Sequence, residues 1–301
     1  MKIFISLLLL SLSSFALELP WSNQFREPNA ILTKFTDTED YDLVEDEREG
    51  PGWRYFYGDA GESKNIIIFN HPGSLLKHDY KKAVERKFEN MQAIADWFAN
   101  NNAYFYAPLR KRYSNTNIWG DEYERNIVPL ELFHHFTNLA KSKHGPNANL
   151  CYVGTSSGGA SVLFASTVYS GHFVSISPEA RGSYGKRYNE FSFIDYGDNR
   201  NAKNLTVLIG ANELKTIEEG AHDDMVWDIN NHPDPYQRIF RKTAYAERFA
   251  HFERLYSAFK DVESSEIKVE VTKEDLNHQQ LSRDINIHEW GEYVLKGCGF
   301  K

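Results

Sequence analysis

The sequence predicts an α/β protein with a mostly parallel sheet that is flanked by helices on both faces. Short apolar runs rich in β-branched residues alternate along the chain with longer segments of helical spacing. The clearest run, residues 65–69 (NIIIF), has no polar residue after its first position, which is typical of a strand that is buried on both faces. Repeated alternation of strand and helix produces a parallel sheet with helices packed on its two sides.

Eight segments are expected to form the strands of this sheet. Turn signals mark several of their ends. Pro51 and Gly52 precede the second strand, and Pro108 stops the fourth because proline has no N–H to donate to a neighbour. The expected strands cover residues 30–35, 53–57, 65–69, 103–107, 149–153, 173–177, 205–209 and 267–271.

Five segments are expected to form helices. Within residues 83–100 the apolar side chains recur on one helical face. Two other segments, residues 178–203 and 214–235, are long, polar and aperiodic, and we expect them to be lid-like insertions. Because there is no internal repeat, residues 17–301 are predicted to form a single domain. The other expected helices cover residues 127–142, 160–169, 236–259 and 286–295.

The first 16 residues (MKIFISLLLLSLSSFA) predict a signal peptide. Lys2 provides a positive start, residues 3–12 are mostly apolar, and Ser14 and Ala16 are small residues at the positions that signal peptidase reads. The apolar stretch is shorter than the roughly 20 residues that a stable membrane helix needs. The mature chain is therefore expected to begin near Leu17 and to be secreted or periplasmic.

Charge and cysteine content exclude several classes of protein. The chain has 34 lysines and arginines against 42 acidic residues, and a net charge of −8 disfavours nucleic acid as a partner. Two cysteines are too few for a disulfide-dense scaffold or a cysteine-only zinc site. Cys151 lies in an apolar strand segment, where a buried free thiol is expected, although pairing with Cys298 stays open. No metal and no cofactor is predicted, because the histidines and carboxylates of residues 214–235 are expected to be solvated.

A motif of the type G-x-S-x-G points to nucleophilic chemistry. The strand expected at residues 149–153 leads directly into residues 154–159 (GTSSGG), and a helix of small and apolar residues follows. In this strand–turn–helix context the central serine stands on a tight turn with its hydroxyl clear of the sheet. The N–H groups at the start of the helix can stabilise a developing oxyanion. Ser156 is the candidate nucleophile, because centring the motif on Ser157 would put Thr155 in place of the first glycine.

With this motif the chain resembles the α/β-hydrolase family. The resemblance covers residues 53–297 in the order of the elements. In sequence it is specific around GTSSGG and, more loosely, around NHPGS at residues 70–74. It implies acyl transfer by a triad that runs serine, acid, histidine along the chain, with the acid after a late strand and the histidine after the last strand.

The resemblance implies that His278 is the general base, since it is the one histidine between the last expected strand and the last expected helix. A histidine titrates near neutral pH and can accept the serine proton and return it to the leaving group. Glu213 is the expected acid, because it is the first carboxylate after the strand at residues 205–209. A Ser–His pair without an acid is one alternative. The others are carboxylates further into the loop, namely Glu218, Glu219, Asp223 and Asp224.

The resemblance also implies an oxyanion hole after the strand at residues 65–69. In the segment NHPGS, Pro72 has no N–H to donate. Gly73 or Ser74 is therefore expected to donate together with the N–H of Ser157. A simple turn between strand and helix is the alternative. His71 is expected to be structural, because it lies far from the position of the base.

These residues together imply a secreted or periplasmic serine hydrolase that cleaves small-molecule carboxylic esters through an acyl-enzyme on Ser156. A serine peptidase or amidase on the same triad is an alternative, although no second large domain is present to select a peptide. A non-catalytic binding protein on the same scaffold is disfavoured, because nucleophile, base and glycine turn occur together. The sequence identifies neither the acyl group nor the alcohol, and it leaves the oligomeric state open.

Overall fold

The structure is a computed structural model that describes residues 31–34, 54–72, 80–108, 128–178, 204–260 and 266–301. Three expectations fall outside these residues. They are the signal peptide, the lid-like insertion at residues 178–203 beyond Pro178, and the oxyanion donors Gly73 and Ser74.

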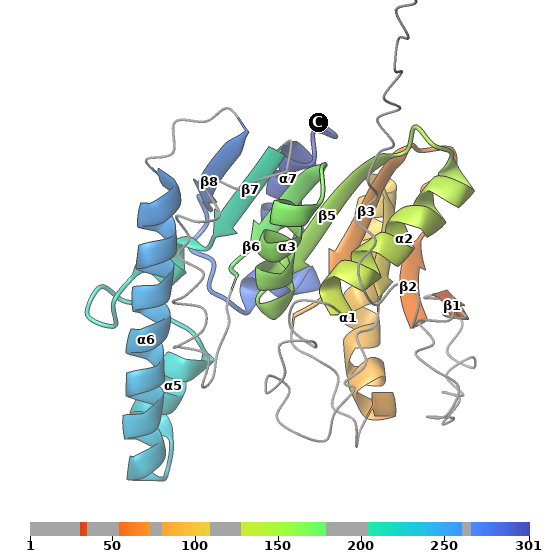
Figure 1. Cartoon of the computed structure of the whole chain (residues 1–301). Helices are drawn as coiled ribbons and strands as arrows, with labels where there is room; N and C mark the ends of the chain where they lie inside the picture. Colours follow the sequence, from red (N-terminus) through yellow and green to blue (C-terminus); the bar gives the residue numbers. More distant parts are fainter. Residues whose placement is uncertain (1–30, 35–53, 73–79, 109–127, 179–203, 261–265) are drawn as a thin grey trace, which may run out of the picture.

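Eight strands form one sheet in the order β1-β2-β4-β3-β5-β6-β7-β8 (Figure 1). The six strands β3 to β8 run parallel to one another, whereas β2 pairs antiparallel with β4 and parallel with β1. The predicted, mostly parallel sheet is therefore confirmed. Its strands are β1 (Ile31–Lys34), β2 (Arg54–Gly58), β3 (Asn65–Asn70), β4 (Tyr104–Pro108), β5 (Asn149–Thr155), β6 (His172–Ile176), β7 (Asn204–Ile209) and β8 (Ile267–Val271).

Helices cover both faces of the sheet (Figure 1). On one face lie α1 (Tyr80–Asn100) and α7 (Ile287–Gly297). On the other lie α2 (Val128–His144), α3 (Ser157–Val168) and α6 (Pro235–Lys260). Among the helices of the described ranges, none combines the length and the apolarity that crossing a bilayer requires.

Strand β3 shows why its sequence has no polar alternation. Ile67 and Phe69 belong to the core on the side of α1 and α7, while Ile66 and Ile68 belong to the core on the side of α2, α3 and α6. All four side chains are fully buried. Since both sets of alternating side chains meet a layer of helices, every position of the strand interior must be apolar.

The predicted strands and helices are all present, with ends that differ by a few residues. One further helix, α5 (Asp224–Asn231), falls in the segment 214–235 that was expected to be aperiodic. The carboxylate of Asp223 caps this helix by accepting the N–H of Val226 at 2.8 Å. Val226 shares a small buried cluster with Tyr245 of α6. A helix of eight residues presents too few apolar positions for its periodicity to be recognised.

Cys151 in β5 forms a disulfide with Cys298, the residue that follows α7. Their Cα atoms are 5.4 Å apart, and both residues are fully buried. The free thiol expected for Cys151 is therefore wrong. Cys151 faces the side of the sheet that α7 covers, so the end of this helix brings Cys298 onto the strand. The two residues are 147 positions apart, and spacing alone gave no sign of the pairing.

Candidate active site

Three predicted site residues come together at the carboxyl edge of the sheet. Ser156 directly follows β5, Glu213 lies in the short 3₁₀ turn Ala211–Leu214 after β7, and His278 lies in the loop after β8. The carboxyl ends of parallel strands meet at one edge of a sheet, which is where ligands bind in open α/β sheets. The topology thus gathers residues that are far apart in the chain.

The three side chains form a continuous line of hydrogen bonds. The Nε2 atom of His278 lies 2.9 Å from the Oγ of Ser156, and its Nδ1 lies 2.8 Å from the Oε1 of Glu213. The carboxylate is almost completely buried, and the imidazole is mostly buried. With a proton on Nδ1, the imidazole donates to Glu213, and its Nε2 can accept the proton of the Ser156 hydroxyl.

Ser156 occupies a strained turn between β5 and α3. Its φ of 55° and ψ of −121° lie where residues other than glycine are rarely found. Two backbone hydrogen bonds hold it there. Its N–H donates to the carbonyl of Ile176 at 2.9 Å, and its carbonyl accepts the N–H of Ala160 at 3.0 Å. Such strain persists where the surroundings fix the conformation, and it is common at active sites.

The two glycines of the motif are required by the closeness of the backbone around this turn. A Cβ atom at Gly154 would lie 2.4 Å from the carbonyl oxygen of Gly158. A Cβ at Gly158 would lie 2.0 Å from the carbonyl oxygen of Asn70 at the end of β3. Neither distance leaves room for a side chain. This packing of strand, turn and helix therefore requires glycine at both positions.

The Glu213 carboxylate has a different set of partners at each oxygen. Its Oε1 faces His278, while its Oε2 accepts hydrogen bonds from the Ser177 hydroxyl and, at 2.8 Å, from the N–H of Gly210. Ser177 is buried and has a positive φ of 42°. Ser177 was not among the site residues expected from the sequence. Its one signal is its place at the carboxyl end of β6, between the strands that carry Ser156 and Glu213.

Asp223 and Asp224, two of the alternative acids, belong to helix α5. Asp223 caps the helix and forms an ion pair with Arg248 of α6, in which both side chains are buried. Asp224 is exposed in the first turn of α5. Both carboxylates therefore belong to the hairpin that α5 and α6 form.

Glu218 and Glu219, the other alternative acids, are exposed. Glu219 accepts hydrogen bonds from the backbone N–H of Thr216 at 2.8 Å and from its hydroxyl at 3.0 Å. These bonds, the backbone one foremost, lower the pKa of the Glu219 carboxyl. Within the described residues, Glu213 is the carboxylate that lies within hydrogen-bond distance of His278.

The start of α3 directly follows Ser156 in the chain. Ser157, the predicted oxyanion donor, is its first residue and is buried. His71 is also buried, and its Nδ1 lies 3.1 Å from the carbonyl oxygen of Pro72. The neighbouring Asn70 is fully buried, and among the described residues neither its Nδ2 nor its Oδ1 has a hydrogen-bond partner. This polar group beside the Ser156 turn was not singled out from the sequence.

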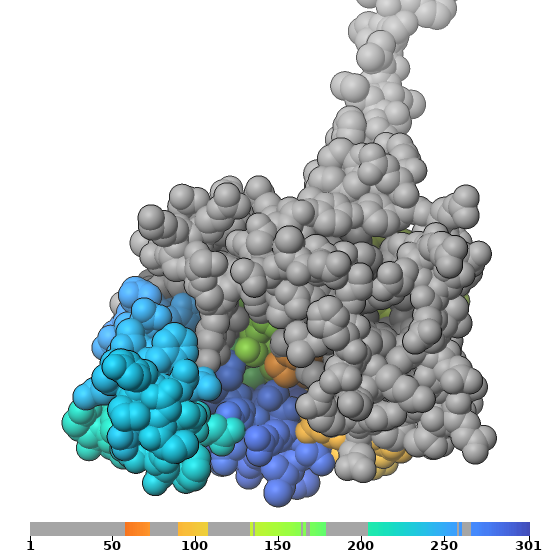
Figure 2. Space-filling view, turned by 90° about the horizontal axis from the view of Figure 1, so that it is seen from below, coloured from red at the N-terminus to blue at the C-terminus, as the bar shows by residue number. Residues whose placement is uncertain are grey.

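Figure 2 shows the molecule from the side of the carboxyl edge of the sheet. Green atoms from the segment of β5 and α3 and orange atoms from the segment of β3 are visible there, next to blue atoms from the C-terminal part of the chain. The segments that carry Ser156 and His278 therefore meet at this edge.

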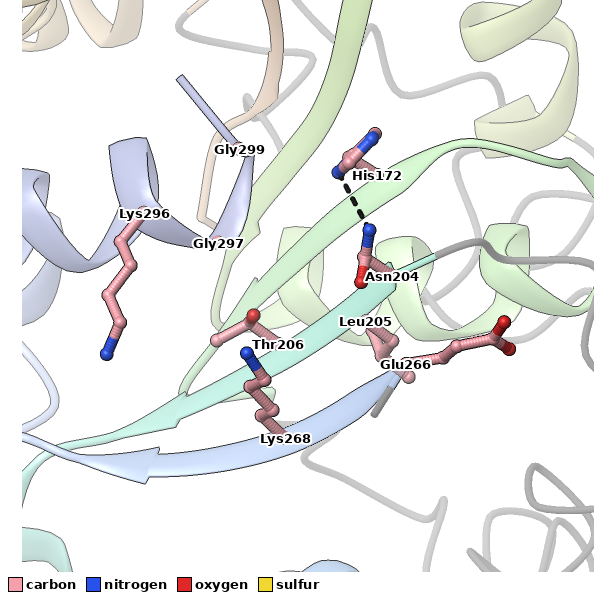
Figure 3. A pocket seen from close by; sticks show the side chains of 9 residues that line it. All are labelled: His172, Asn204, Leu205, Thr206, Glu266, Lys268, Lys296, Gly297 and Gly299. Carbon is pink, nitrogen blue, oxygen red and sulfur yellow. Dashed lines mark hydrogen bonds between the residues drawn. The ribbon is translucent and has the colours of Figure 1, made fainter. Parts of the chain in front are cut away.

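A separate cavity of about 200 Å³ lies at the opposite end of the strands (Figure 3). It is lined by His172, Asn204 and Glu266, which stand at or just before the starts of β6, β7 and β8. The Nδ2 of Asn204 lies 3.3 Å from the Nδ1 of His172. Because the triad residues follow the other ends of strands in the same sheet, this cavity is not a substrate pocket for Ser156.

Two histidines of other segments, His134 and His232, have local contacts. The Nε2 of His134 lies 3.1 Å from Asn138 Nδ2, and the Nδ1 of His232 accepts the N–H of Asp234 at 3.1 Å. In the part of the chain that the structure describes, no three side chains of His, Cys, Asp or Glu gather as a metal site would require.

Solved structures of several hydrolases are similar to this chain. A protein from Klebsiella pneumoniae described as a dienelactone hydrolase has 12% identity and a TM-score of 0.45, with 84% of this chain and 95% of that chain covered. The siderophore hydrolase EstA from Aspergillus nidulans has 11% identity and a TM-score of 0.44, with 81% and 86% covered. The esterase Pf2001 from Pyrococcus furiosus has 13% identity and a TM-score of 0.40, with 80% and 83% covered. No family model and no curated protein matches the chain.

The features of the chain itself define its fold. Helices cover both faces of an eight-stranded sheet in which the six strands β3 to β8 are parallel. A strained serine joins β5 to α3, and an acid and a histidine follow it after later strands. The turn of the serine and this chain order are those of the α/β-hydrolases. The chain therefore has the α/β-hydrolase fold.

Proposed function

We propose that this protein is a serine hydrolase that cleaves carboxylic esters through an acyl-enzyme on Ser156. The observation that carries the proposal is the line of hydrogen bonds from Glu213 through His278 to Ser156, which ends on a strained turn at the start of a helix. A nucleophile, a base within hydrogen-bond distance and a third group that orients the base are what acyl transfer needs.

In the first half of the reaction, the Oγ of Ser156 attacks the ester carbonyl carbon while its proton passes to Nε2 of His278. The carbonyl electron pair moves onto oxygen, and the N–H of Ser157 at the start of α3 donates to it, with Gly73 or Ser74 as the second donor. The carbonyl then re-forms, the bond to the alkoxy oxygen breaks, and this oxygen takes the proton from His278. Glu213 stabilises the imidazolium throughout.

In the second half, water attacks the acyl group on Ser156 and gives its proton to His278. The bond between Oγ and the acyl carbon breaks, Oγ takes that proton, and the carboxylic acid leaves. The same three side chains thus serve both halves, and the protein's own groups return to their starting protonation states.

We further propose that the protein acts outside the cytoplasm, in the periplasm or as a secreted protein. The signal-peptide pattern of the first 16 residues motivates this. The disulfide between Cys151 and Cys298 supports it, since disulfides persist in oxidising compartments. Mass measurement of the exported protein should give an N-terminus at Leu17, and an exported soluble protein that keeps Met1 would contradict the signal peptide.

Hydrolysis of a panel of esters tests the proposed reaction. The panel is p-nitrophenyl esters from acetate to palmitate, with feruloyl and siderophore-type esters, and with matched anilides to detect amidase activity. We expect turnover of one or more esters by the wild type and a loss of at least about 10³-fold in Ser156→Ala. Turnover of anilides alone would favour a peptidase or amidase. No turnover by folded protein would favour a binding protein.

A further inference from the structure

The proposed acid and base are each preceded in the chain by a buried asparagine. Asn212 precedes Glu213, and Asn277 precedes His278. They are only 1% and 7% exposed. The two side-chain amides donate to the same acceptor, the backbone carbonyl oxygen of His222, with Nδ2–O distances of 2.7 Å and 3.1 Å. A single carbonyl therefore joins the loop of the acid to the loop of the base.

The oxygen atoms of both amides are also bound. The Oδ1 of Asn212 accepts the N–H of His222 at 3.0 Å. The Oδ1 of Asn277 accepts the N–H groups of Gln279 and Gln280 at 3.1 Å and 3.0 Å. A buried polar network in which the members are satisfied is rigid and fixes one arrangement of the chain. The hydrogen bonds thus hold each loop in one position relative to His222.

The two loops also touch through their backbones. The N–H of Asn212 donates to the carbonyl of Leu276 at 3.1 Å. A Cβ atom on Gly210 would lie 2.3 Å from that same carbonyl oxygen, so glycine permits the close approach. Catalytic groups must be held within about 0.5 Å of their productive geometry. Contacts at the residue before the acid and at the residues before the base constrain the Glu213–His278 distance directly.

We propose that Asn212 and Asn277 are a pair of positioning residues that hold Glu213 against His278 through the shared carbonyl of His222. The inference rests on the proposed function, because it assigns a role within the same triad. It also links the triad to the hairpin of α5 and α6, because His222 directly precedes Asp223, the residue that caps α5. Loss of either amide donor removes one of the hydrogen bonds that hold the two loops against each other.

Two substitutions test the pair through activity. Asn277→Asp keeps an oxygen for the N–H groups of Gln279 and Gln280 but has no N–H for the carbonyl of His222, and Asn212→Ala removes the other donor. Each is expected to lower kcat on the best ester about 10- to 100-fold with little change in KM, since misplacement of a catalytic group by about 1 Å costs about that much. The double variant should be little worse than either single one, because both donors act through one acceptor.

Asn149→Ala is the control. The side-chain amide of Asn149 donates to the Oδ1 of Asn65 at 3.3 Å where β5 and β3 begin, at the end of the sheet opposite to Ser156. Its loss should lower Tm and leave kcat unchanged. If the Asn212 and Asn277 variants lower Tm to a similar extent and also leave kcat unchanged, both residues are structural and the inference is wrong.

A spectroscopic measurement makes the test independent of turnover. A proton on Nδ1 of a histidine bound to a carboxylate resonates far downfield and exchanges slowly with water. In Asn277→Asp and Asn212→Ala this signal of His278 is expected to move upfield or to broaden, whereas in Asn149→Ala it should stay as in the wild type. An unchanged signal would overturn the inference even in an active enzyme. If the signal changes in these variants but the wild type hydrolyses no ester, Asn212 and Asn277 still position Glu213 and His278, and the proposed function is wrong.

Discussion

At the scale of single residues, the two oxygen atoms of the Glu213 carboxylate have different partners. Its Oε2 is bound by Ser177 and Gly210, which leaves Oε1 for His278. Ser177 is held at a positive φ of 42°, and its N–H donates to the carbonyl of Leu208 at 2.7 Å. A strained and buried hydroxyl that binds the proposed acid is expected to matter for the orientation of the carboxylate.

Ser177→Ala removes one donor from this buried carboxylate. Because hydrogen bonds to charged groups contribute about 1.5–3 kcal/mol, we expect a loss of stability of about 2 kcal/mol and a fall in kcat of about tenfold. Denaturation and steady-state kinetics measure the two effects. Ser166→Ala is the control, because that buried hydroxyl of α3 donates to the carbonyl of Leu163 and not to the triad. Equal kinetics of the two variants would contradict a role for Ser177.

Glu213→Gln keeps the shape of the acid and removes its charge. The tautomer with a proton on Nδ1 of His278 is then no longer enforced, so kcat is expected to fall about 10²- to 10⁴-fold with little change in folding. Glu218→Gln, at an exposed carboxylate of the same loop, should retain wild-type kcat. If the Glu213 variant keeps its activity, the protein works as a Ser156–His278 pair.

That Ser156, Glu213 and His278 lie together could be predicted from the sequence, because each of them follows a recognisable strand. Ser156 has a motif, and Glu213 and His278 are the first carboxylate and the one histidine in their segments. Ser177 and the asparagine pair could not be predicted. Polar partners of this kind are brought together by the packing of loops, which leaves no fixed spacing in the sequence.

At the scale of elements, the hairpin of α5 and α6 is fastened to the acid loop by buried polar groups. Tyr245 of α6 donates its hydroxyl to the carbonyl of Lys215 at 2.9 Å, and Arg248 lies over its ring, 5.3 Å from the centroid. Burial, the larger cause, and the negative charge of Glu213 together raise the pKa of Tyr245 to about 12. The phenol thus stays protonated in the folded protein at pH values at which an exposed tyrosine ionises.

This raised pKa predicts how stability depends on alkaline pH. An unfolded tyrosine ionises near pH 10, so its contribution to stability is present below about pH 10 and is lost as pH rises toward about 12. Tyr245→Phe has no proton to lose. Denaturation at several pH values from 9 to about 12 should therefore show a shallower fall in the free energy of unfolding than in the wild type. Parallel curves would contradict the assigned environment of Tyr245.

Elements with a strong hydrophobic pattern could be predicted from the sequence, and elements with a weak pattern could not. The apolar run of β3 admits one explanation, a strand between two layers of helices. Helix α5 was missed because its eight residues depend on a cap and on packing against α6. The antiparallel direction of β2 was not predicted either, because residues 54–58 have no pattern that distinguishes one direction from the other.

At the scale of the whole molecule, one covalent bond joins the centre of the sheet to the C-terminal end of the chain. Cys151 lies in the strand that leads to Ser156, and Cys298 directly follows helix α7. The sequence could not decide this pairing, because two cysteines 147 positions apart meet through the packing of α7 on the sheet. The fold class, in contrast, follows from local alternation of strand and helix, and it was predicted.

Removal of the disulfide should destabilise the protein. Closing so long a loop reduces the entropy of the unfolded chain, and the chain-entropy model gives about 5 kcal/mol for it. Cys298→Ala is therefore expected to unfold at lower denaturant concentration than the wild type and to show no response to reductant. Reductant added to the unfolded wild type should lower its midpoint to that of the variant. A wild type with two titratable thiols and no response to reductant would contradict the pairing.

The central claim is that Ser156 is a nucleophile activated by His278, and mapping of a fluorophosphonate adduct tests it most directly. The folded wild type should form one adduct, located by mass spectrometry on the peptide that contains Ser156. His278→Ala should label at least about 10³-fold more slowly, because triad members act as a unit. An adduct on another residue, or folded wild-type protein that forms none, would contradict the account.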